Sequence, residues 1–535
     1  MAAPKLTIVG LDAATFDVID PLLAGGDLPN LARLIERGAR GPLRSTTHPL
    51  TPLAWTTMVT GVNAGRHGIW DFSERDETGY ALRLVNGSSA RAPALWTRLS
   101  AAGHSVGVVN VPFTWPAPDV DGFVVAGMDA WARDDGMTTP RALIAELHER
   151  FGVLRVDHTF PLTSDDAFDL AHVRAVCEQR AELVGWLAER YDPDLLFVVF
   201  MSADHVHHLA WPDWEERGRE SVVADVYRLL DGALGDVLRR VGDDGNVLVV
   251  SDHGGGSLDG VVNLNAWLAQ AGYLAYRDDA DVGADVGHRL FELRRKLPAN
   301  LRRAVKQRVP RLRERAYRVR HAPSVIDWSR TRAFSYGTFG NIVVNVRGRE
   351  RDGVVEPGAE YERVRDELIE RLSGLEMVAA VHRREDLFEG PHLDRVPDLV
   401  VEFADYAWLG KGNLTERADA IEDRIDVRGH PGAHYVGSHR PDGIAVLSGP
   451  AARAGATFSA SIVDIAPTAL YLLGESIPSD LEGRLLSEAI DRDLLDDRPP
   501  EYVEAIDLEL GAPRAYDEEG AAEVEERLRS LGYLE

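Results

Sequence analysis

Short apolar runs alternate with longer segments of helical periodicity along this chain of 535 residues. The runs at 6–12, 195–201 and 246–251 are largely apolar, which is typical of parallel strands that are buried on both faces. Between such runs, segments like 28–38 and 92–104 repeat their apolar residues at helical spacing. The alternation predicts βαβ units, and with them an α/β fold with a mostly parallel central sheet flanked by helices.

The same patterns divide the chain into three parts. Residues 1–264 carry the first part of the predicted core, and residues 436–535 complete it and end in an amphipathic helix. Between them, residues 265–435 are expected to form a large inserted lobe, in which apolar runs at 340–346 and 397–403 predict two further strands.

Acidic residues dominate the charge of the chain. There are 86 Asp and Glu residues against 59 Lys and Arg residues, so the formal net charge is -27. A charge of this sign argues against a nucleic-acid partner. One segment, 289–320, departs from the trend with thirteen basic residues and only two acids, Glu292 and Glu314. It predicts either a docking surface for an anionic substrate, a membrane face or a partner, or a solvated helical hairpin that pairs with the acidic remainder of the protein.

Cysteine content and hydropathy narrow the class of protein further. Cys177 is the single cysteine, which excludes an intramolecular disulfide framework and a four-cysteine zinc site. The N-terminus leads directly into an apolar strand without a charged region before a longer apolar one. No apolar stretch approaches the roughly 20 residues that a transmembrane helix needs. We therefore expect a cytoplasmic protein without a transmembrane segment; the sequence gives no indication of an oligomeric state.

Acidic residues follow three of the predicted strands. Asp12, Asp204 and Asp252 stand at or just beyond the ends of their apolar runs, and open α/β sheets carry their chemistry past the carboxyl ends of the strands. His208 comes four residues after Asp204, and His253 directly follows Asp252. Carboxylates and imidazoles that converge at one sheet edge have the composition of a metal site. The pattern therefore predicts an enzyme.

Thr51 is the candidate nucleophile. It precedes Pro52 and a helix-like run, so we expect Thr51 at the N-cap and the proline at the first helical position. One interpretation is that Thr51 only caps the helix. The other is that its hydroxyl, held beside a metal at a helix N-terminus that favours phosphate, attacks phosphorus.

The chain resembles a known group of enzymes. Five motifs occur in the order found in the alkaline phosphatase superfamily: "VGLDAATFDVID", "LTPLAWTTMVTGVNAGRHGI", "SADHVHH", "VVSDHGG" and "GSHRPDGI". The match is strongest to its type I phosphodiesterase/nucleotide pyrophosphatase family of predicted phosphohydrolases, and it spans most of the chain. The resemblance implies an alkaline phosphatase-like α/β fold and a small-molecule phosphoester substrate.

The resemblance also implies two metal sites and a mechanism. One metal, which activates the nucleophile, would be held by Asp12, Thr51, Asp252 and His253, and the other by Asp204, His208 and His439. The expected ions are Zn²⁺, with Mn²⁺ as the alternative. Thr51 would attack the phosphoryl group, and the phosphothreonine would then be hydrolysed. His430 and His434 lie in the same segment as His439 and are alternatives to it as the last ligand.

One departure from the family pattern concerns the substrate. Relatives that cleave nucleotide diesters carry an asparagine shortly after "HGI", where this chain has Phe72. Another donor, such as Asn86 or an arginine of the inserted lobe, must replace it, or the substrate differs. We favour a phosphodiester, with a monoester as the alternative.

Three other functions compete with phosphoester hydrolysis. A sulfatase would need Cys or Ser as the nucleophile, where this chain has Thr51. A cofactor-independent phosphomutase would share the fold and use serine. A non-catalytic metal-binding protein could dock through the basic segment, although such a protein would have no reason to keep all seven metal-site residues.

Overall fold

A computed structural model shows how these segments are arranged. It describes residues 4–75, 80–130, 135–155, 169–242, 244–277, 325–412, 414, 420–423 and 436–530. The basic segment 289–320, His430 and His434 lie outside the described residues. No helix in these ranges combines the length and the apolar character needed to cross a membrane.

A nine-stranded sheet forms the centre of the molecule, in the order β21-β2-β20-β9-β1-β8-β5-β6-β7. Its outer strands are β21 (Ala460–Ser461), β2 (Gly38–Arg44), β20 (Asp442–Ser448) and β7 (Thr138–Thr139). At its middle, β1 (Leu6–Leu11) pairs in parallel with β8 (Leu195–Phe200) on one side and β9 (Asn246–Val250) on the other. The parallel pairing continues through β5 (Val106–Val109) to β6 (Gly122–Val125). The mostly parallel α/β fold is therefore confirmed.

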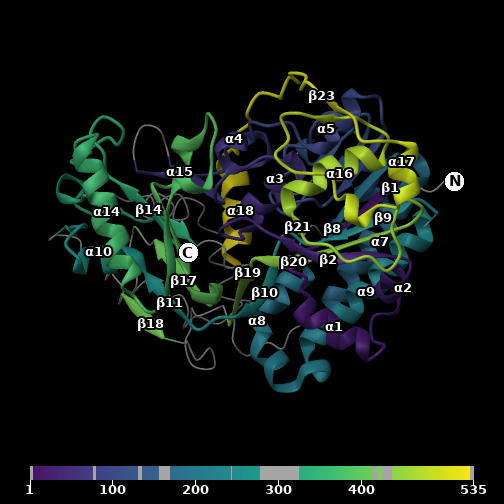
Figure 1. The fold of residues 1–535 in the computed structure, drawn as a ribbon, viewed down its shortest axis with the longest axis horizontal. Helices are drawn as coiled ribbons and strands as arrows, with labels where there is room; N and C mark the ends of the chain where they lie inside the picture. Colours follow the sequence, from purple (N-terminus) through teal and green to yellow (C-terminus); the bar gives the residue numbers. More distant parts are fainter. Residues whose placement is uncertain are drawn as a thin grey trace.

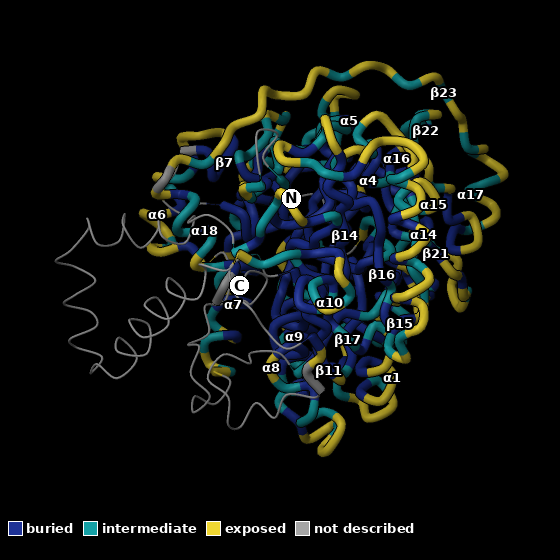
Figure 2. Tube along the Cα trace, turned by 90° about the vertical axis from the view of Figure 1, so that its left-hand side faces the viewer, coloured by how far each residue is buried: buried dark blue, intermediate teal, exposed yellow. Residues whose placement is uncertain are grey.

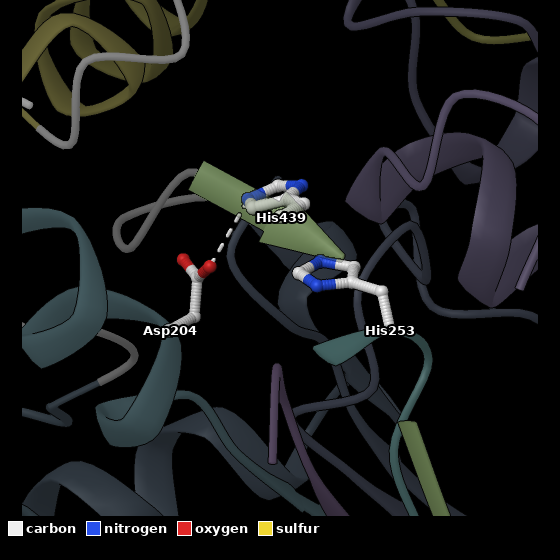
Figure 3. A group of neighbouring side chains, drawn as sticks. All are labelled: Asp204, His253 and His439. Atoms are coloured by element: carbon white, nitrogen blue, oxygen red, sulfur yellow. Dashed lines mark ion pairs between the residues drawn. The ribbon is translucent and has the colours of Figure 1, made fainter. Parts of the chain in front are cut away.

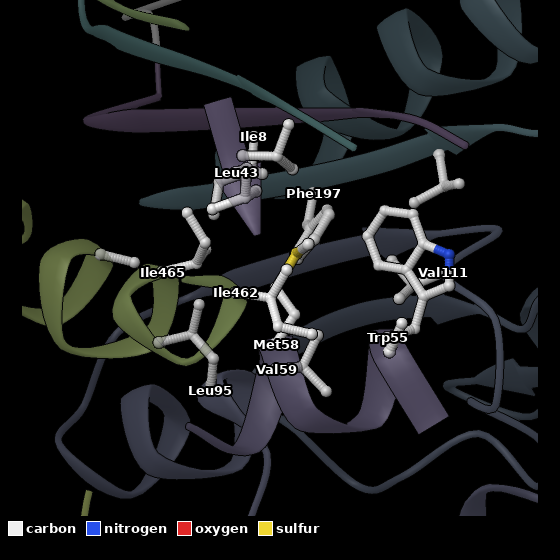
Figure 4. Packing of buried hydrophobic residues seen from close by; sticks show 14 of the residues in the cluster. Ile8, Leu43, Trp55, Met58, Val59, Leu95, Val111, Phe197, Ile462 and Ile465 are labelled. Atoms are coloured by element: carbon white, nitrogen blue, oxygen red, sulfur yellow. The ribbon is translucent and has the colours of Figure 1, made fainter. Parts of the chain in front are cut away.

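Helices cover both faces of this sheet (Figure 1). Because successive side chains of a strand point to opposite faces, Ile8 belongs to one core cluster and Val9 to the other. On the face of Ile8 lies α3 (Thr51–Thr60), whose Trp55 and Met58 pack in the same cluster as Ile8 (Figure 4). The opposite face is covered by α7 (Leu170–Tyr191) and α9 (Val222–Val241).

Two smaller four-stranded sheets lie beside the central sheet (Figure 1) and are formed mostly by the predicted lobe, although one of them includes β11 (Gly260–Asn263), which precedes it. In one of them, β14 (Asn341–Val344) and β16 (Leu399–Phe403) pair antiparallel and correspond to the strands predicted at 340–346 and 397–403. The helix α14 (Ala359–Ser373) packs against this sheet through Val364 and Leu368, which share its apolar cluster. Around this sheet the side chains thus form a third apolar cluster, which also takes in Val262 and Leu264 from before the predicted lobe.

An extended segment returns the chain to the central domain after β23 (Tyr502–Val503), and Figure 2 shows most of it exposed. At its end, the Tyr516 ring stacks on Trp115 with 4.3 Å between centroids. In the terminal helix α18 (Glu518–Ser530), Arg527 donates to the carbonyl oxygens of Met128 and Ala130 at 2.8 and 2.6 Å. These contacts fix the helix that the sequence predicts at the C-terminus.

Candidate functional site

The three strand-end carboxylates meet at one edge of the central sheet. Asp12 directly follows β1, Asp204 lies in the first turn of α8 (Ser202–Arg217) after β8, and Asp252 lies two residues beyond β9. All three residues are fully buried. Their convergence follows from the parallel pairing of three adjacent strands, as the sequence pattern predicts.

Asp204, His208 and His439 form a first group of candidate metal ligands. The four-residue spacing places Asp204 and His208 on one face of α8, with 3.2 Å between Asp204 Oδ1 and His208 Nε2. His439 comes from β19 (Gly437–Arg440), which pairs with β10 (Gly254–Ser257) next to His253. Its Nε2 lies 3.2 Å from Asp204 Oδ1 and 2.9 Å from His208 Nε2. Figure 3 shows the side chains of Asp204, His253 and His439 pointing toward one another.

Backbone carbonyls determine which ring nitrogens of this group carry protons. His208 Nδ1 donates to Gly437 O at 3.0 Å, and His439 Nδ1 donates to Pro49 O. In its neutral form each ring bonded in this way presents the lone pair of its Nε2, and both Nε2 atoms face the Asp204 carboxylate. Burial lowers the pKa of His439, with the Asp204 carboxylate opposing, and so disfavours a protonated imidazole. A bound metal cation satisfies all three acceptors, and a carbonyl behind the imidazole is the usual support of a metal-ligating histidine.

Asp12, Asp252 and His253 form a second group. His253 Nε2 lies 3.3 Å from Asp252 Oδ2 and 3.8 Å from Asp12 Oδ1, and His253 Nδ1 donates to Gly254 O at 3.0 Å. Burial, and after it the negative charge of Asp204, raise the pKa of Asp252 well above its ordinary value, because both disfavour a second negative charge in the interior. His253 also lies close to the first group: the ligand atoms of Asp204, His253 and His439 lie within 4.8 Å of one another, and so do those of Asp12, Asp252 and His253. The donor set thus fits two divalent cations.

Thr51 differs from its expected place by one position. Leu50 is the N-cap of α3 without a side-chain cap, and Thr51 is already the first helical residue, so the prediction that Thr51 caps the helix is wrong. The Thr51 hydroxyl is fully buried and has no hydrogen-bond partner among the residues that the structure describes. One helical turn further on, Trp55 Nε1 donates to Asp12 Oδ2 at 2.7 Å. Two residues before Thr51, Pro49 O accepts from His439. Thr51 thus lies between Pro49, which is hydrogen-bonded to His439 of the first group, and Trp55, which is hydrogen-bonded to Asp12 of the second.

Several side chains that the sequence raised as alternatives are engaged elsewhere. Phe72 is buried against Phe113, with 5.8 Å between ring centroids. Asn86 donates to Arg514 O at 2.9 Å and accepts from Ser88 N at 3.0 Å. Neither side chain supplies the donor that relatives have after "HGI".

Three residues near the site were missed by the sequence interpretation. His48 and Pro49 precede Thr51, and Phe339 reaches the His439 ring from the lobe, with 5.2 Å between centroids. His48 and Pro49 directly precede the motif that begins at Leu50, so their place near the site could have been predicted. The contact of Phe339 with His439 is visible only in the folded structure.

Comparison with known proteins gives one family. A family model described as type I phosphodiesterase / nucleotide pyrophosphatase matches residues 6–433. No curated protein matches the chain.

Two similar solved structures share the fold. Phosphonoacetate hydrolase from Sinorhizobium meliloti 1021, in complex with phosphonoformate, has a TM-score of 0.52 at 15% identity, over 88% of this chain and 95% of that chain. Murine ectonucleotide pyrophosphatase / phosphodiesterase 5 has a TM-score of 0.50 at 16% identity, over 91% of this chain and 100% of that chain. An inactive threonine-to-alanine variant of the murine protein, in complex with AMP, is similar at 15% identity with a TM-score of 0.50, over the same shares of both chains. These similarities confirm the predicted alkaline phosphatase-like fold.

Proposed function

Since this chain belongs to the type I phosphodiesterase / nucleotide pyrophosphatase family and is thus a hydrolase acting on phosphoester bonds, we propose that it cleaves a small-molecule phosphodiester through a phosphothreonine on Thr51. The observation that carries the proposal is the buried Thr51 hydroxyl, which lacks a hydrogen-bond partner among the described residues. It lies on a helix whose next turn binds Asp12. A buried hydroxyl without a partner costs stability, and a role as nucleophile explains why it is kept.

The proposed metal ligands follow the two groups. Asp12, Thr51, Asp252 and His253 would hold one cation, and Asp204, His208 and His439 the other. The mixture of carboxylate oxygens and imidazole nitrogens suits Zn²⁺, with Mn²⁺ as the alternative. When bound, such cations supply the positive charge that favours an ionised hydroxyl and stabilises the charged phosphoryl group.

The chain's own residues then orient and transfer the phosphoryl group. Thr51 stands at the N-terminus of α3, where the helix dipole and free N–H groups favour a phosphoryl anion. Its Oγ1 forms the bond to phosphorus as its proton passes to solvent, the bond from phosphorus to the leaving oxygen breaks, and that oxygen takes up a proton from solvent to depart as the alcohol. Water then hydrolyses the phosphothreonine and restores the hydroxyl. The threonine-to-alanine substitution of the murine variant, which is described as inactive, supports this role of a threonine.

The preference for a diester has separate support. Phe72 stands where diester-cleaving relatives place a polar donor, and it is buried in the core, so nucleotide recognition of that kind is not expected. Beside the loop that leads to Thr51, the largely buried rings of Trp70 and Phe339 pack around His48, with centroids 5.4 and 6.2 Å from that of His48, so the protein next to the nucleophile is apolar. Apolar surface suits a second ester group better than the extra charge of a monoester. The predicted cytoplasmic location stays a prediction.

The test compares p-nitrophenol release from a monoester and from a bis-ester by protein loaded with Zn²⁺ or Mn²⁺. We expect faster release from the bis-ester, and a loss of at least about 10³-fold in Thr51→Ala with the fold and most of the bound metal kept. Thr56→Ala is the matched control, because it removes another buried threonine hydroxyl of the same helix.

The outcomes separate the proposed function from its alternatives. Near-normal turnover in Thr51→Ala would disprove the threonine nucleophile. A faster monoester would correct the substrate class. Metal-loaded protein that releases nothing from either ester would favour phosphomutase-like phosphotransfer or a non-catalytic docking protein.

A further inference from the structure

A segment of the lobe packs directly on a candidate metal ligand of the core. The Phe339 ring lies against the His439 imidazole, with 5.2 Å between centroids and 32° between planes, and it also approaches His48 at 6.2 Å. Phe339 is only 8% exposed, so both contacts are made inside the protein. His439 in turn stacks on His253 at 3.8 Å. Phe339 of the lobe therefore packs beside the stacked rings of His439 and His253, whose nitrogens are candidate metal ligands.

The backbone holds Phe339 in an unfavourable conformation. Its φ is +67°, and a bulky residue with positive φ persists only where its surroundings impose it, most often at functional sites. Gly340 follows at φ +92°, and a Cβ there would lie 2.6 Å from Val401 O. Val401 N donates to Gly340 O at 2.9 Å. The close approach of β16 thus fixes the turn that presents Phe339.

The same strand is bonded to the loop that leads to Thr51. His48 Nε2 donates to Val401 O at 3.1 Å, so Val401 joins the Phe339 turn to the core. His48 also has positive φ, at +63°, and its carbonyl accepts from Leu50 N at 2.8 Å. The next carbonyl, that of Pro49, accepts from His439 Nδ1. One hydrogen-bonded path therefore runs from the lobe to the backbone support of His439.

A second attachment fastens the lobe beside this path. Asn341 Oδ1 accepts from Trp70 Nε1 at 3.0 Å. Asn341 Nδ2 donates to Asp71 Oδ2 and to Tyr336 O, both at 3.1 Å. Because Asn341 lies two residues after Phe339, a displacement that moves this segment away from His439 would also strain its bonds to Trp70 and Asp71.

We infer that Phe339 is a positioning residue for His439, and that seating of the lobe and binding of a divalent cation at Asp204, His208 and His439 are linked. The inference rests on the proposed function, because it takes His439 as a ligand. Groups that support a metal ligand from behind set its orientation and its affinity. Linkage is reciprocal: if the seated lobe favours the cation, the cation favours the seated lobe to the same extent.

The test measures metal affinity without any substrate. Zn²⁺ is titrated in competition with a chromophoric chelator into wild type, Phe339→Leu and Phe334→Leu. Both variants remove a buried aromatic ring from the same lobe, but Phe334 packs near Trp328 and Tyr80 instead of His439. We expect Phe339→Leu to weaken Zn²⁺ binding by about 10- to 100-fold and Phe334→Leu to leave it unchanged.

A second measurement is the effect of Zn²⁺ on amide hydrogen exchange. This effect would not change in the variant if Phe339 only stabilised the fold. In wild type, Zn²⁺ should slow amide exchange in β14 and β16, and in Phe339→Leu this protection should be lost while the metal-free rates of the two proteins stay alike. Equal Zn²⁺ affinity in Phe339→Leu and wild type would overturn the inference and leave the proposed function standing. A wild-type protein that binds no divalent cation would overturn both.

Discussion

At the scale of single residues, Trp55 connects the packing of the core to the chemistry of the site. Its indole is fully buried between α3 and the central sheet, and its N–H donates to the Asp12 carboxylate at 2.7 Å. A hydrogen bond to a charged acceptor contributes more than a neutral one. The bond also orients a carboxylate that stands in the second ligand group, so one side chain supports both the fold and the proposed metal.

The substitution Trp55→Phe keeps an aromatic ring and removes this donor. We expect it to lower the free energy of unfolding by about 1–3 kcal/mol and to weaken metal binding by about 10- to 100-fold, as loss of an outer hydrogen bond does elsewhere. Urea unfolding and chelator competition measure the two effects. Trp96→Phe is the control, because Trp96 is a buried indole of the same cluster on α5 (Leu95–Ala101). Metal affinity that falls equally in both variants would contradict the role given to Trp55.

At the scale of elements, the sequence predicts those features that a local pattern determines. Asp12, Asp204 and Asp252 can be placed together because each ends a run that is buried on both faces, and such runs are typical of parallel strands. The sequence places Thr51 one position early, since Thr before Pro fits both the N-cap and the first turn, and only the extended backbone of Leu50 decides between them.

Contacts between the lobe and the core could not be predicted in this way. Trp70 and Asn341 are bonded across 271 positions of sequence, and Phe339 reaches His439 only because β16 carries Val401 to the nucleophile loop. Neither Phe339 nor Asn341 is of a residue type or in a spacing that would indicate a catalytic or metal-binding role. Their pairing depends on contacts between segments far apart in the sequence, which periodicity and spacing along one segment do not encode.

Asp71, which is hydrogen-bonded to Asn341 where the lobe meets the core, should make the free energy of unfolding depend on pH. Burial raises the pKa of Asp71 to about 7, although hydrogen bonds from Phe72 and Asn341 oppose the shift. The unfolded pKa is about 3.9, so the folded state retains the proton between about pH 4 and 7. Stability from this group is therefore greatest below pH 4, falls as the pH rises to about 7, and is level above it.

An asparagine at position 71 does not titrate, so Asp71→Asn should remove this pH-dependent fall in the free energy of unfolding. The fall amounts to at most about 4 kcal/mol. Urea unfolding from pH 5 to 8, at constant metal and salt, measures the slope in wild type and variant. Asp129→Asn is the matched control: burial raises the pKa of Asp129 only to about 6, so its removal should change the slope below pH 6 alone. Identical slopes for wild type and Asp71→Asn between pH 6 and 7 would show that Asp71 titrates at its ordinary value.

At the scale of the whole molecule, the net negative charge of the chain determines how its stability responds to salt. The excess of 86 acidic over 59 basic residues gives a net charge of -27. Like charges repel in the compact state, and this repulsion weakens as salt shortens the Debye length from about 10 Å at 0.1 M to about 3 Å at 1 M. Exposed ion pairs such as Arg44–Asp442 and Arg347–Glu356 are screened as well, but each contributes roughly 0–1 kcal/mol.

Net repulsion should therefore outweigh the pairs, and added salt should stabilise the protein. We expect Tm to rise by several degrees between about 0.05 and 0.5 M NaCl, with most of the gain below about 0.2 M, where the Debye length changes most. Sucrose at equal osmolality is the control for effects of excluded solute, which grow steadily with concentration. Thr51→Ala should show the same rise, because the repulsion belongs to the whole surface and not to the site. A Tm that stays level or falls over the low-salt range would mean that local pairing, and not the excess of negative charge, dominates the electrostatic free energy of this fold.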